Sequence, residues 1–293
     1  MMMNYPSERL LEAQLEHYQQ WYEQARELHD RSYYEEALIY YDKALEYQPD
    51  DYWVWYHRGG VLEKMRYYGE ALESYHKALQ INSHSYWPWY EMGCIALEEL
   101  QEYERAIAYF QSALEIRPED YWSYYKQGEA WRKSKHYEDA IACFEKALTI
   151  RSDDFWSIYR QGDAYQEIGN LEQALCFYER ALHIKPNDCW SWYQRGNILQ
   201  KQGCLYAAIS SYRRALEFDC ENDIFWYEQA VCYTLLGDIN GVIRTLEQAI
   251  FLIPDKYITL VESKIIFAKM REKEEFKNFL QTAKNLLSSP KNQ

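Results

Sequence analysis

Small and apolar residues recur along the chain at helical spacing, with a period of about 34 residues. Five glycines follow one another at intervals of 34, 35, 34 and 34 residues: Gly59, Gly93, Gly128, Gly162 and Gly196. After each glycine comes a stripe of three residues. It begins with an alanine, an aromatic residue follows four positions later, and a second alanine follows seven positions after the first. Residues three and four apart share one face of a helix. The pattern therefore predicts two packed helices per period.

We number each repeat so that Tyr52 is position 1 and Gly59 is position 8. Position 8 is Gly or Ala throughout, position 24 is aromatic in six repeats, and position 27 is Ala in all seven. The third repeat carries one extra residue between positions 8 and 20. Small residues at positions 8, 20 and 27 let the two helices approach closely, and the ring at position 24 fills the gap between them.

A polar residue precedes each first helix after the first repeat, and it is suited to cap that helix. These residues are Asp51, Ser85, Asp120, Asp154, Asp188 and Asn222. A side-chain oxygen at this position accepts from an otherwise unpaired backbone N–H and stabilises the helix by about 1 kcal/mol. We therefore expect a helix to begin directly after each of them.

The period and these positions resemble the tetratricopeptide repeat (TPR) family, as an array of many repeats. The resemblance covers residues 18–256 as seven repeats: 18–51, 52–85, 86–120, 121–154, 155–188, 189–222 and 223–256. It implies an all-α fold, a right-handed superhelical α-solenoid of about seven helical hairpins with helical caps. In this family the first helices line a concave groove, which usually holds an extended peptide or a helix.

The two ends of an array need caps, because a terminal repeat has a neighbour on one side only. We expect residues 1–17 to form an N-terminal capping or extension helix, and 257–293 to form a degenerate eighth hairpin as the C-terminal cap. The apolar residues expected in that hairpin are Ile258, Val261, Ile265, Phe267, Phe276, Leu280 and Ala283. Lys264 stands at its position 8, so we expect looser packing there.

Tryptophan is concentrated at two positions of the repeat, because ten of the eleven Trp residues lie at position 2 or 4. At about 100° per residue, position 4 shares a helix face with position 8 and is expected to pack in the core. Position 2 shares a face with position 5, which is Tyr in all seven repeats. In the TPR family this second face lines the groove. The candidate partner-binding residues are Trp53, Tyr56, Trp87, Tyr90, Trp122, Tyr125, Lys126, Arg132, Trp156, Tyr159, Arg160, Trp190 and Tyr193.

Two alternatives remain open for this surface. The position-2 indoles are either ligand-facing or staples between neighbouring repeats, and both roles are compatible. Lys126, Arg132 and Arg160 are either readers of an acidic or C-terminal carboxylate group, or ordinary solvated charges. The carboxylate clamp of chaperone-binding TPR proteins needs Lys at position 5, where this chain has Tyr. Binding of chaperone tails is therefore not expected.

Composition narrows the class of partner. The 293 residues carry 32 Lys and Arg against 46 Asp and Glu, a net charge of −14, which disfavours nucleic-acid binding through phosphates. No apolar run has membrane-span or signal-peptide length, so we expect no membrane insertion and a cytoplasmic location. The seven cysteines form no C-x-x-C pair, and we expect scattered buried thiols rather than disulfides or a zinc site.

Catalytic signatures are missing from the sequence, which has no P-loop, nucleophile-elbow or zinc-protease motif. We therefore expect no enzyme activity and no cofactor. The favoured function is a protein-interaction adaptor that binds a peptide or helix of a partner protein in an aromatic-lined groove. The alternatives are a scaffold that docks partners by its convex face or ends, and a binder of single-stranded nucleic acid or glycan through the Trp/Tyr ladder. The partner and the oligomeric state are open.

Overall fold

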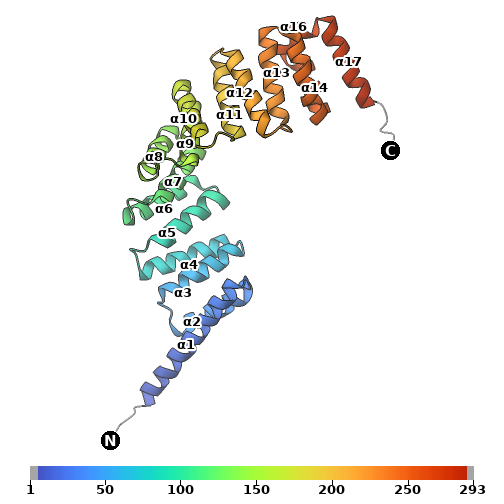
Figure 1. The fold of residues 1–293 in the computed structure, drawn as a ribbon. Helices are drawn as coiled ribbons and strands as arrows, with labels where there is room; N and C mark the ends of the chain where they lie inside the picture. The colour runs from blue at the N-terminus through green and yellow to red at the C-terminus, as the bar shows by residue number, and fades with distance from the viewer. Residues whose placement is uncertain (1–5, 289–293) are drawn as a thin grey trace. The chain divides into compact units, whose positions relative to one another are not determined.

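The structure, a computed structural model, describes residues 6–288 as helices that follow one another in packed pairs (Figure 1). The chain divides into two compact units, an N-terminal unit that ends at Arg151 and a C-terminal unit that begins at Ser152. We describe each unit by itself. Within residues 6–288, no helix has both the length and the apolar character needed to span a membrane.

Four helix pairs build the N-terminal unit. They are α1 (Pro6–Asp30) with α2 (Tyr34–Tyr47), α3 (Tyr52–Lys64) with α4 (Tyr68–Ile81), α5 (Tyr86–Cys94) with α6 (Tyr103–Ile116), and α7 (Tyr121–Lys133) with α8 (Tyr137–Ile150). A π-helical turn, η1 (Ile95–Glu99), continues α5.

The C-terminal unit continues the same pattern. Its pairs are α9 (Phe155–Glu167) with α10 (Leu171–Ile184), α11 (Cys189–Lys201) with α12 (Leu205–Phe218), and α13 (Asp223–Leu236) with α14 (Ile239–Leu252). The last segment comprises α15 (Pro254–Ser263), the 3₁₀ turn η2 (Ile265–Phe267), α16 (Ala268–Arg271) and α17 (Glu274–Ser288).

The predicted all-α architecture of successive helix pairs is confirmed. The handedness of the superhelix, the number of repeats and the division into 1–17, 18–256 and 257–293 stay predictions. Residues 1–5 of the predicted N-terminal cap and 289–293 of the C-terminal cap lie outside the described residues.

In the second to sixth repeats, the two helices of a pair touch where the position-8 glycine meets the position-24 ring. A Cβ atom added to Gly59 would lie 2.8 Å from Tyr75 Cε1, one added to Gly93 2.7 Å from Phe110, and one added to Gly196 2.6 Å from Tyr212. These distances are shorter than non-bonded carbon atoms tolerate. The backbone of the first helix therefore packs directly on the ring of the second, and the ring is completely or almost completely buried.

The extra residue of the third repeat is accommodated in the π-helical turn Ile95–Glu99. A π turn absorbs one inserted residue without ending the helix. Because the turn follows Gly93, the Gly93–Phe110 contact keeps the geometry found in the other repeats.

All six predicted capping residues occupy the N-cap position, but only four of their side chains accept the capping hydrogen bond. Asp51, Asp120, Asp154 and Asp188 accept from the backbone N–H three residues ahead. The Ser85 and Asn222 side chains do not. Ser85 Oγ instead lies 2.5 Å from the Tyr52 hydroxyl, and Asn222 donates to Asp219 at 3.0 Å.

Consecutive repeats of the N-terminal unit are joined by the tyrosine at position 1. The Tyr18 hydroxyl donates to Asp51 Oδ2 at 2.8 Å, and the Tyr86 hydroxyl donates to Asp120 Oδ2 at the same distance. Each acceptor is the N-cap of the following repeat. One carboxylate thus caps its own helix and holds the preceding repeat, a contact between repeats that the sequence analysis did not identify.

Two expectations were wrong in detail. Ile265 was expected in the core of the last hairpin but is 87% exposed, because the chain is extended at Lys264 and α15 ends there. The Arg271 guanidinium donates to the carbonyls of Val261 and Lys264 at 2.7 and 2.9 Å and satisfies the broken helix end. Of the cysteines expected to be buried, Cys176, Cys204 and Cys220 are exposed.

Adjacent glycines on α3 provide a test of the glycine–ring contact. Gly59→Ala should lower the free energy of unfolding by about 1–3 kcal/mol, because its Cβ would overlap the Tyr75 ring. Gly60→Ala should be neutral or stabilise by up to about 1 kcal/mol, since the atoms nearest its Cβ lie 3.8 Å away. Urea denaturation measures both variants. Equal effects at the two positions would contradict the contact.

The hydroxyl joining the repeats is tested by Tyr86→Phe. This variant should lose about 1–2 kcal/mol of unfolding free energy, because it removes a hydrogen bond to the Asp120 carboxylate and retains the ring. Tyr67→Phe, at an exposed ring, is the matched control and should change the stability by less than about 0.5 kcal/mol. A Tyr86→Phe variant as stable as this control would show that the bond does not hold the repeats together.

Candidate partner-binding surface

The five position-2 indoles lie at the start of the first helices and are about half exposed. The exposed fractions are 52% for Trp53, 43% for Trp87 and 48% for Trp122 in the N-terminal unit, and 50% for Trp156 and 44% for Trp190 in the C-terminal unit. Large aromatic side chains are normally buried more deeply than this. Each unit therefore presents indole surface on the face that the sequence analysis selected.

The position-4 indoles have the different role that the sequence predicts. Trp21, Trp55, Trp89, Trp192 and Trp226 are partly buried and pack against the hydrophobic core. The indole N–H of Trp55 donates to the Pro49 carbonyl at 2.7 Å, and that of Trp192 to the Pro186 carbonyl at 2.8 Å. Trp55 and Trp192 thus hold the loop before their helix, and none of the five residues is part of the candidate surface.

Position-5 tyrosines form the floor beside the exposed indoles. Trp87 meets Tyr90 edge-on at 6.5 Å, and Tyr90 in turn packs on the core ring of Phe110 at 5.8 Å. The equivalent rings of Tyr56, Tyr125 and Tyr193 are likewise half-buried. Tyr159 is only 8% exposed, so it supports Trp156 and offers little surface of its own.

A cation that the sequence analysis missed packs over the indole in three repeats. The Arg117 guanidinium lies 4.2 Å from the Tyr86 ring centre and 5.2 Å from that of Trp87. Arg151 lies in the same way over Tyr121 and Trp122, and Lys185 over Phe155 and Trp156. Each cation is the C-cap of the second helix of its own repeat, where the helix dipole favours positive charge. In the sequence, a cation recurs about thirty residues after each of these indoles, and this spacing could have identified the contact.

One indole also joins two repeats. Trp190 meets Phe225 of the following repeat edge-on at 5.3 Å, in addition to Tyr193 of its own helix at 5.8 Å. Trp87 and Trp122 instead make their ring contacts with positions 1 and 5 of their own helix. The stapling alternative therefore describes Trp190 best.

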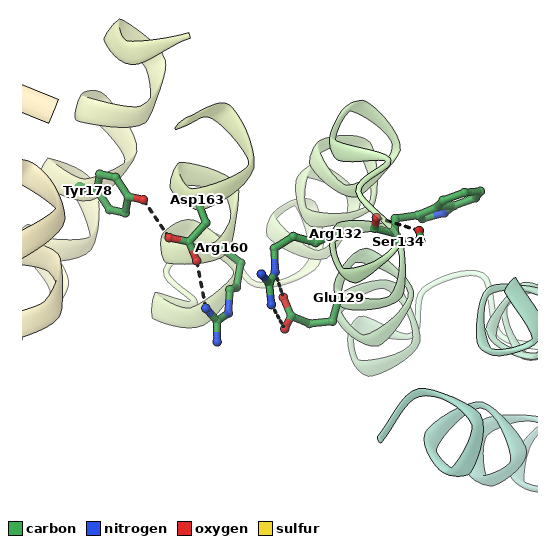
Figure 2. A network of polar contacts seen from close by, with 7 residues as sticks. Glu129, Arg132, Ser134, Arg160, Asp163 and Tyr178 are labelled. Carbon is green, nitrogen blue, oxygen red and sulfur yellow. Dashed lines mark hydrogen bonds and ion pairs between the residues drawn. The ribbon is translucent and has the colours of Figure 1, made fainter. Parts of the chain in front are cut away.

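The three candidate charge readers all have carboxylate partners within their own unit. Lys126 pairs with Glu98, and Arg132 makes a two-pronged pair with Glu129 at 2.9 and 3.0 Å (Figure 2). In the C-terminal unit, Arg160 pairs with Asp163 at 2.9 Å. A carboxylate on a ligand would have to compete with these contacts, and the role of the three cations in recognition stays a prediction.

The tyrosine hydroxyl at position 24 of the second helix donates to polar side chains of the first helix. Tyr178 donates to Asp163 at 2.8 Å (Figure 2), Tyr75 donates to Glu63 at 3.1 Å, and Tyr212 donates to Asn197 at 2.8 Å. The acceptors stand at position 9 or 12 of the first helix. In these three repeats the tyrosine at position 24 thus holds a polar side chain of the first helix in place.

Glu91 is the most strongly perturbed acid on this face. Burial raises the pKa of its carboxyl to about 7, and the negative charge of Glu63 adds to the effect, while Lys64 and the Tyr56 hydroxyl oppose it. A carboxyl with this pKa is partly protonated at neutral pH. The N-terminal unit therefore carries a titratable group beside its indoles.

The stability of the protein should depend on this group. The folded protein binds the Glu91 proton more tightly than the unfolded chain does. The contribution of Glu91 to the free energy of unfolding therefore falls as pH rises from about 4.5 to about 7. Glu91→Gln should therefore stabilise the protein at pH 8 by about 1–2 kcal/mol, and by much less at pH 5. Urea denaturation at both pH values measures this. Glu73→Gln, at an exposed carboxylate of α4, is the control, and a gain independent of pH would contradict the assignment.

Comparison with known families finds TPR models along much of the chain. Models described as tetratricopeptide repeat match residues 54–85, 88–120, 122–154 and 191–220, and one described as TPR repeat matches 162–203. A model described as protein prenyltransferase alpha subunit repeat matches residues 34–65. No curated protein matches the chain by sequence.

Solved structures resemble the chain in fold. YrrB, a TPR protein with an unusual peptide-binding site, is 23% identical and has a TM-score of 0.56, covering 69% of this chain and 100% of its own. The C-terminal part of a TPR repeat-containing protein from Cytophaga hutchinsonii is 18% identical with a TM-score of 0.71, covering 81% and 98%. A tetratricopeptide repeat protein from Parabacteroides merdae is 16% identical with a TM-score of 0.60, covering 92% and 100%.

Proposed function

Since this chain belongs to the tetratricopeptide repeat family, we propose that it is a non-catalytic adaptor that binds a peptide or helical segment of a partner protein. The binding surface is the face of the first helices that carries positions 2 and 5. The half-exposure of all five position-2 indoles carries this proposal. We place the protein in the cytoplasm on the sequence prediction alone.

Physical chemistry supports a role in recognition for these rings. An indole buries a large apolar area on binding and loses little rotamer entropy. Here Arg117, Arg151 and Lys185 already restrict three of the indoles before a partner arrives. Restricting a side chain in advance lowers the entropic cost of association. Exposed aromatic surface with this repeated order is characteristic of an interaction site rather than of a solvated face.

The central anchors of this surface are Trp87, Tyr90, Trp122 and Tyr125 in the N-terminal unit, and Trp156 with its supporting Tyr159 in the C-terminal unit. The peptide-binding site named for YrrB agrees with a peptide ligand. Aromatic packing depends weakly on salt, whereas phosphate contacts weaken steeply as salt rises. Partner binding that persists in high salt would therefore favour a protein segment over single-stranded nucleic acid.

Trp122→Ala and Trp156→Ala test the proposal, singly and together. Partners captured from native lysate by the wild-type protein are identified by mass spectrometry, and their affinities for the variants are then measured. The double variant should bind at least about tenfold more weakly, because truncation of an aromatic anchor costs about 2 kcal/mol or more.

Tyr206→Ala removes an aromatic ring that is 78% exposed on α12, outside the proposed surface, and is the matched control. Helical content and melting temperature show that all variants are folded. A partner retained at full affinity by a folded double variant would contradict the proposed surface and direct attention to the convex face and the ends.

A further inference from the structure

The first repeat differs from the others in the surroundings of its position-24 hydroxyl. Tyr41 is 0% exposed, and its hydroxyl has no hydrogen-bond partner among the described residues. The equivalent hydroxyls of Tyr75, Tyr178 and Tyr212 donate to acceptors at position 9 or 12. The first repeat has Arg26 and His29 at those positions, so it lacks a carboxylate or amide oxygen there. A buried donor without an acceptor is costly, so an acceptor is missing.

Two imidazoles adjoin the same hydroxyl-bearing ring. The His57 ring stacks on Tyr41 with 6.2 Å between centres, and His29 meets Tyr41 edge-on at 6.4 Å. The two imidazoles are 6.5 Å apart. The Trp53 indole also stacks on the His57 ring, with 5.9 Å between ring centres. Trp53 therefore connects this group to the candidate partner-binding surface.

Arg26 supplies a positive charge next to this group. Its guanidinium carbon lies 5.9 Å from the Tyr22 ring centre, and no carboxylate of the described residues forms an ion pair with it. The side chain is exposed. This contrasts with the paired cations Lys126, Arg132 and Arg160. The first repeat thus brings together the Arg26 guanidinium, the Tyr41 hydroxyl and the His29 imidazole, and the second repeat adds the His57 imidazole. All four groups can donate hydrogen bonds to an anion.

The neighbouring repeat leaves space over one of the imidazoles. Position 9 of the second repeat is Gly60, and a Cβ added there would lie 3.8 Å from His29 Cε1. Position 9 carries a side chain in every other repeat. The absence of a side chain at Gly60 keeps this side of His29 uncovered.

The charges around the group favour a single negative charge. Burial, with the nearby Arg26, lowers the pKa of His57 to about 4, and burial lowers that of His29, so both are neutral at pH 7. The other charges that act on them are Asp30, Asp51 and Lys64. Asp51 is engaged as an N-cap and by the Tyr18 hydroxyl. Lys64 is paired with Glu63 at 3.6 Å. The Arg26 guanidinium therefore balances one ligand carboxylate, whereas the second charge of a phosphate would lie near Asp30 and Asp51 with no further cation to balance it.

We propose that Arg26, Tyr41, His29 and His57 form a subsite for one carboxylate group of the partner segment. The assignment deepens the proposed function and rests on it. Arg26 pairs with the carboxylate, and the Tyr41 hydroxyl donates to one of its oxygens. That hydroxyl has no contact with solvent in the free protein, so binding requires side chains around it to move, and Arg26 is the exposed member of the group.

The test uses small peptides followed by NMR of the histidine side chains in the full chain. The probes are acetyl-trialanine with a free C-terminus, its C-terminal amide, the amidated peptide acetyl-Ala-Asp-Ala, and inorganic phosphate. A bound carboxylate stabilises the imidazolium form, so the pKa of His57 should rise on binding. Affinity should correspondingly increase as pH falls from about 7 toward 4. The amidated trialanine should have no effect.

Two variants locate the contact. Arg26→Gln should weaken carboxylate binding about tenfold or more, and Tyr41→Phe about fivefold. Tyr178→Phe is the matched control and should leave probe binding unchanged. The two tyrosine variants should also differ in the free protein. Tyr178→Phe loses a bond to Asp163 and lowers the melting temperature, whereas Tyr41→Phe has no bond to lose.

Each outcome decides the assignment. Binding of either carboxylate peptide that depends on Arg26 and Tyr41 supports it, and the tighter peptide shows whether a side chain or a C-terminus is preferred. Binding of phosphate alone, equal binding of the amide, or insensitivity to both variants overturns it. The peptides lack aromatic groups, so a negative result here is separate from the Trp122 and Trp156 capture experiment. If the carboxylate peptides bind through Arg26 and Tyr41, but the Trp122→Ala/Trp156→Ala variant still captures its partner at full affinity, only the proposed function is contradicted.

Discussion

Direct packing of a glycine backbone on an aromatic ring is the contact on which the second to sixth repeats depend. With 2.6–3.0 Å between the hypothetical Cβ and the ring at Gly59, Gly93, Gly128, Gly162 and Gly196, the two helices of a pair are as close as the ring thickness permits. This closeness determines which faces of the first helix remain available. Positions 4 and 8 are covered, position 5 packs on the same position-24 ring, and position 2 remains about half exposed. The exposed indoles are thus a consequence of how the core is packed.

The same ring also sets the polarity of the exposed face. In three repeats with Tyr at position 24, the second, fifth and sixth, its hydroxyl donates to an acceptor on the first helix, as Tyr178 donates to Asp163. When position 24 is Phe, no such donor exists, and in the fourth repeat Glu129 pairs with Arg132 instead. The identity of one core residue therefore decides whether the core supplies a hydrogen-bond donor to a carboxylate of the first helix: Asp163 accepts from both Tyr178 and Arg160, whereas the fourth repeat has no such core donor for Glu129. This connects the packing of each repeat with the chemistry that it presents.

Features that depend on residues close in sequence could be predicted, and those that join distant residues could not. The stripe at Ala71, Tyr75 and Ala78 and the caps at Asp120 and Asp188 are local patterns, and the structure places them as expected. The Tyr86–Asp120 bond joins residues 34 apart, and Arg117 lies over a ring thirty residues before it. Helical periodicity relates residues three or four positions apart, so it cannot predict contacts between residues thirty or more positions apart. The positions of the exposed indoles could be selected from the sequence, because a helical wheel separates positions 2 and 4, but the carboxylates that neutralise Lys126 and Arg160 could not be identified.

The division of charge among the repeats makes the first repeat of the N-terminal unit chemically distinct. In the fourth and fifth repeats, the cations at positions 6 and 12 are matched by carboxylates of their own unit, so these repeats present aromatic area with little net charge. In the first repeat, Arg26 is exposed beside a buried hydroxyl that lacks an acceptor. The position-2 indoles would then provide most of the apolar contact area for the bound segment. The polar group around Arg26 would determine the direction in which the segment binds. Such a separation is effective because apolar contact is tolerant of register, whereas a single charge-assisted hydrogen bond is satisfied in only one arrangement.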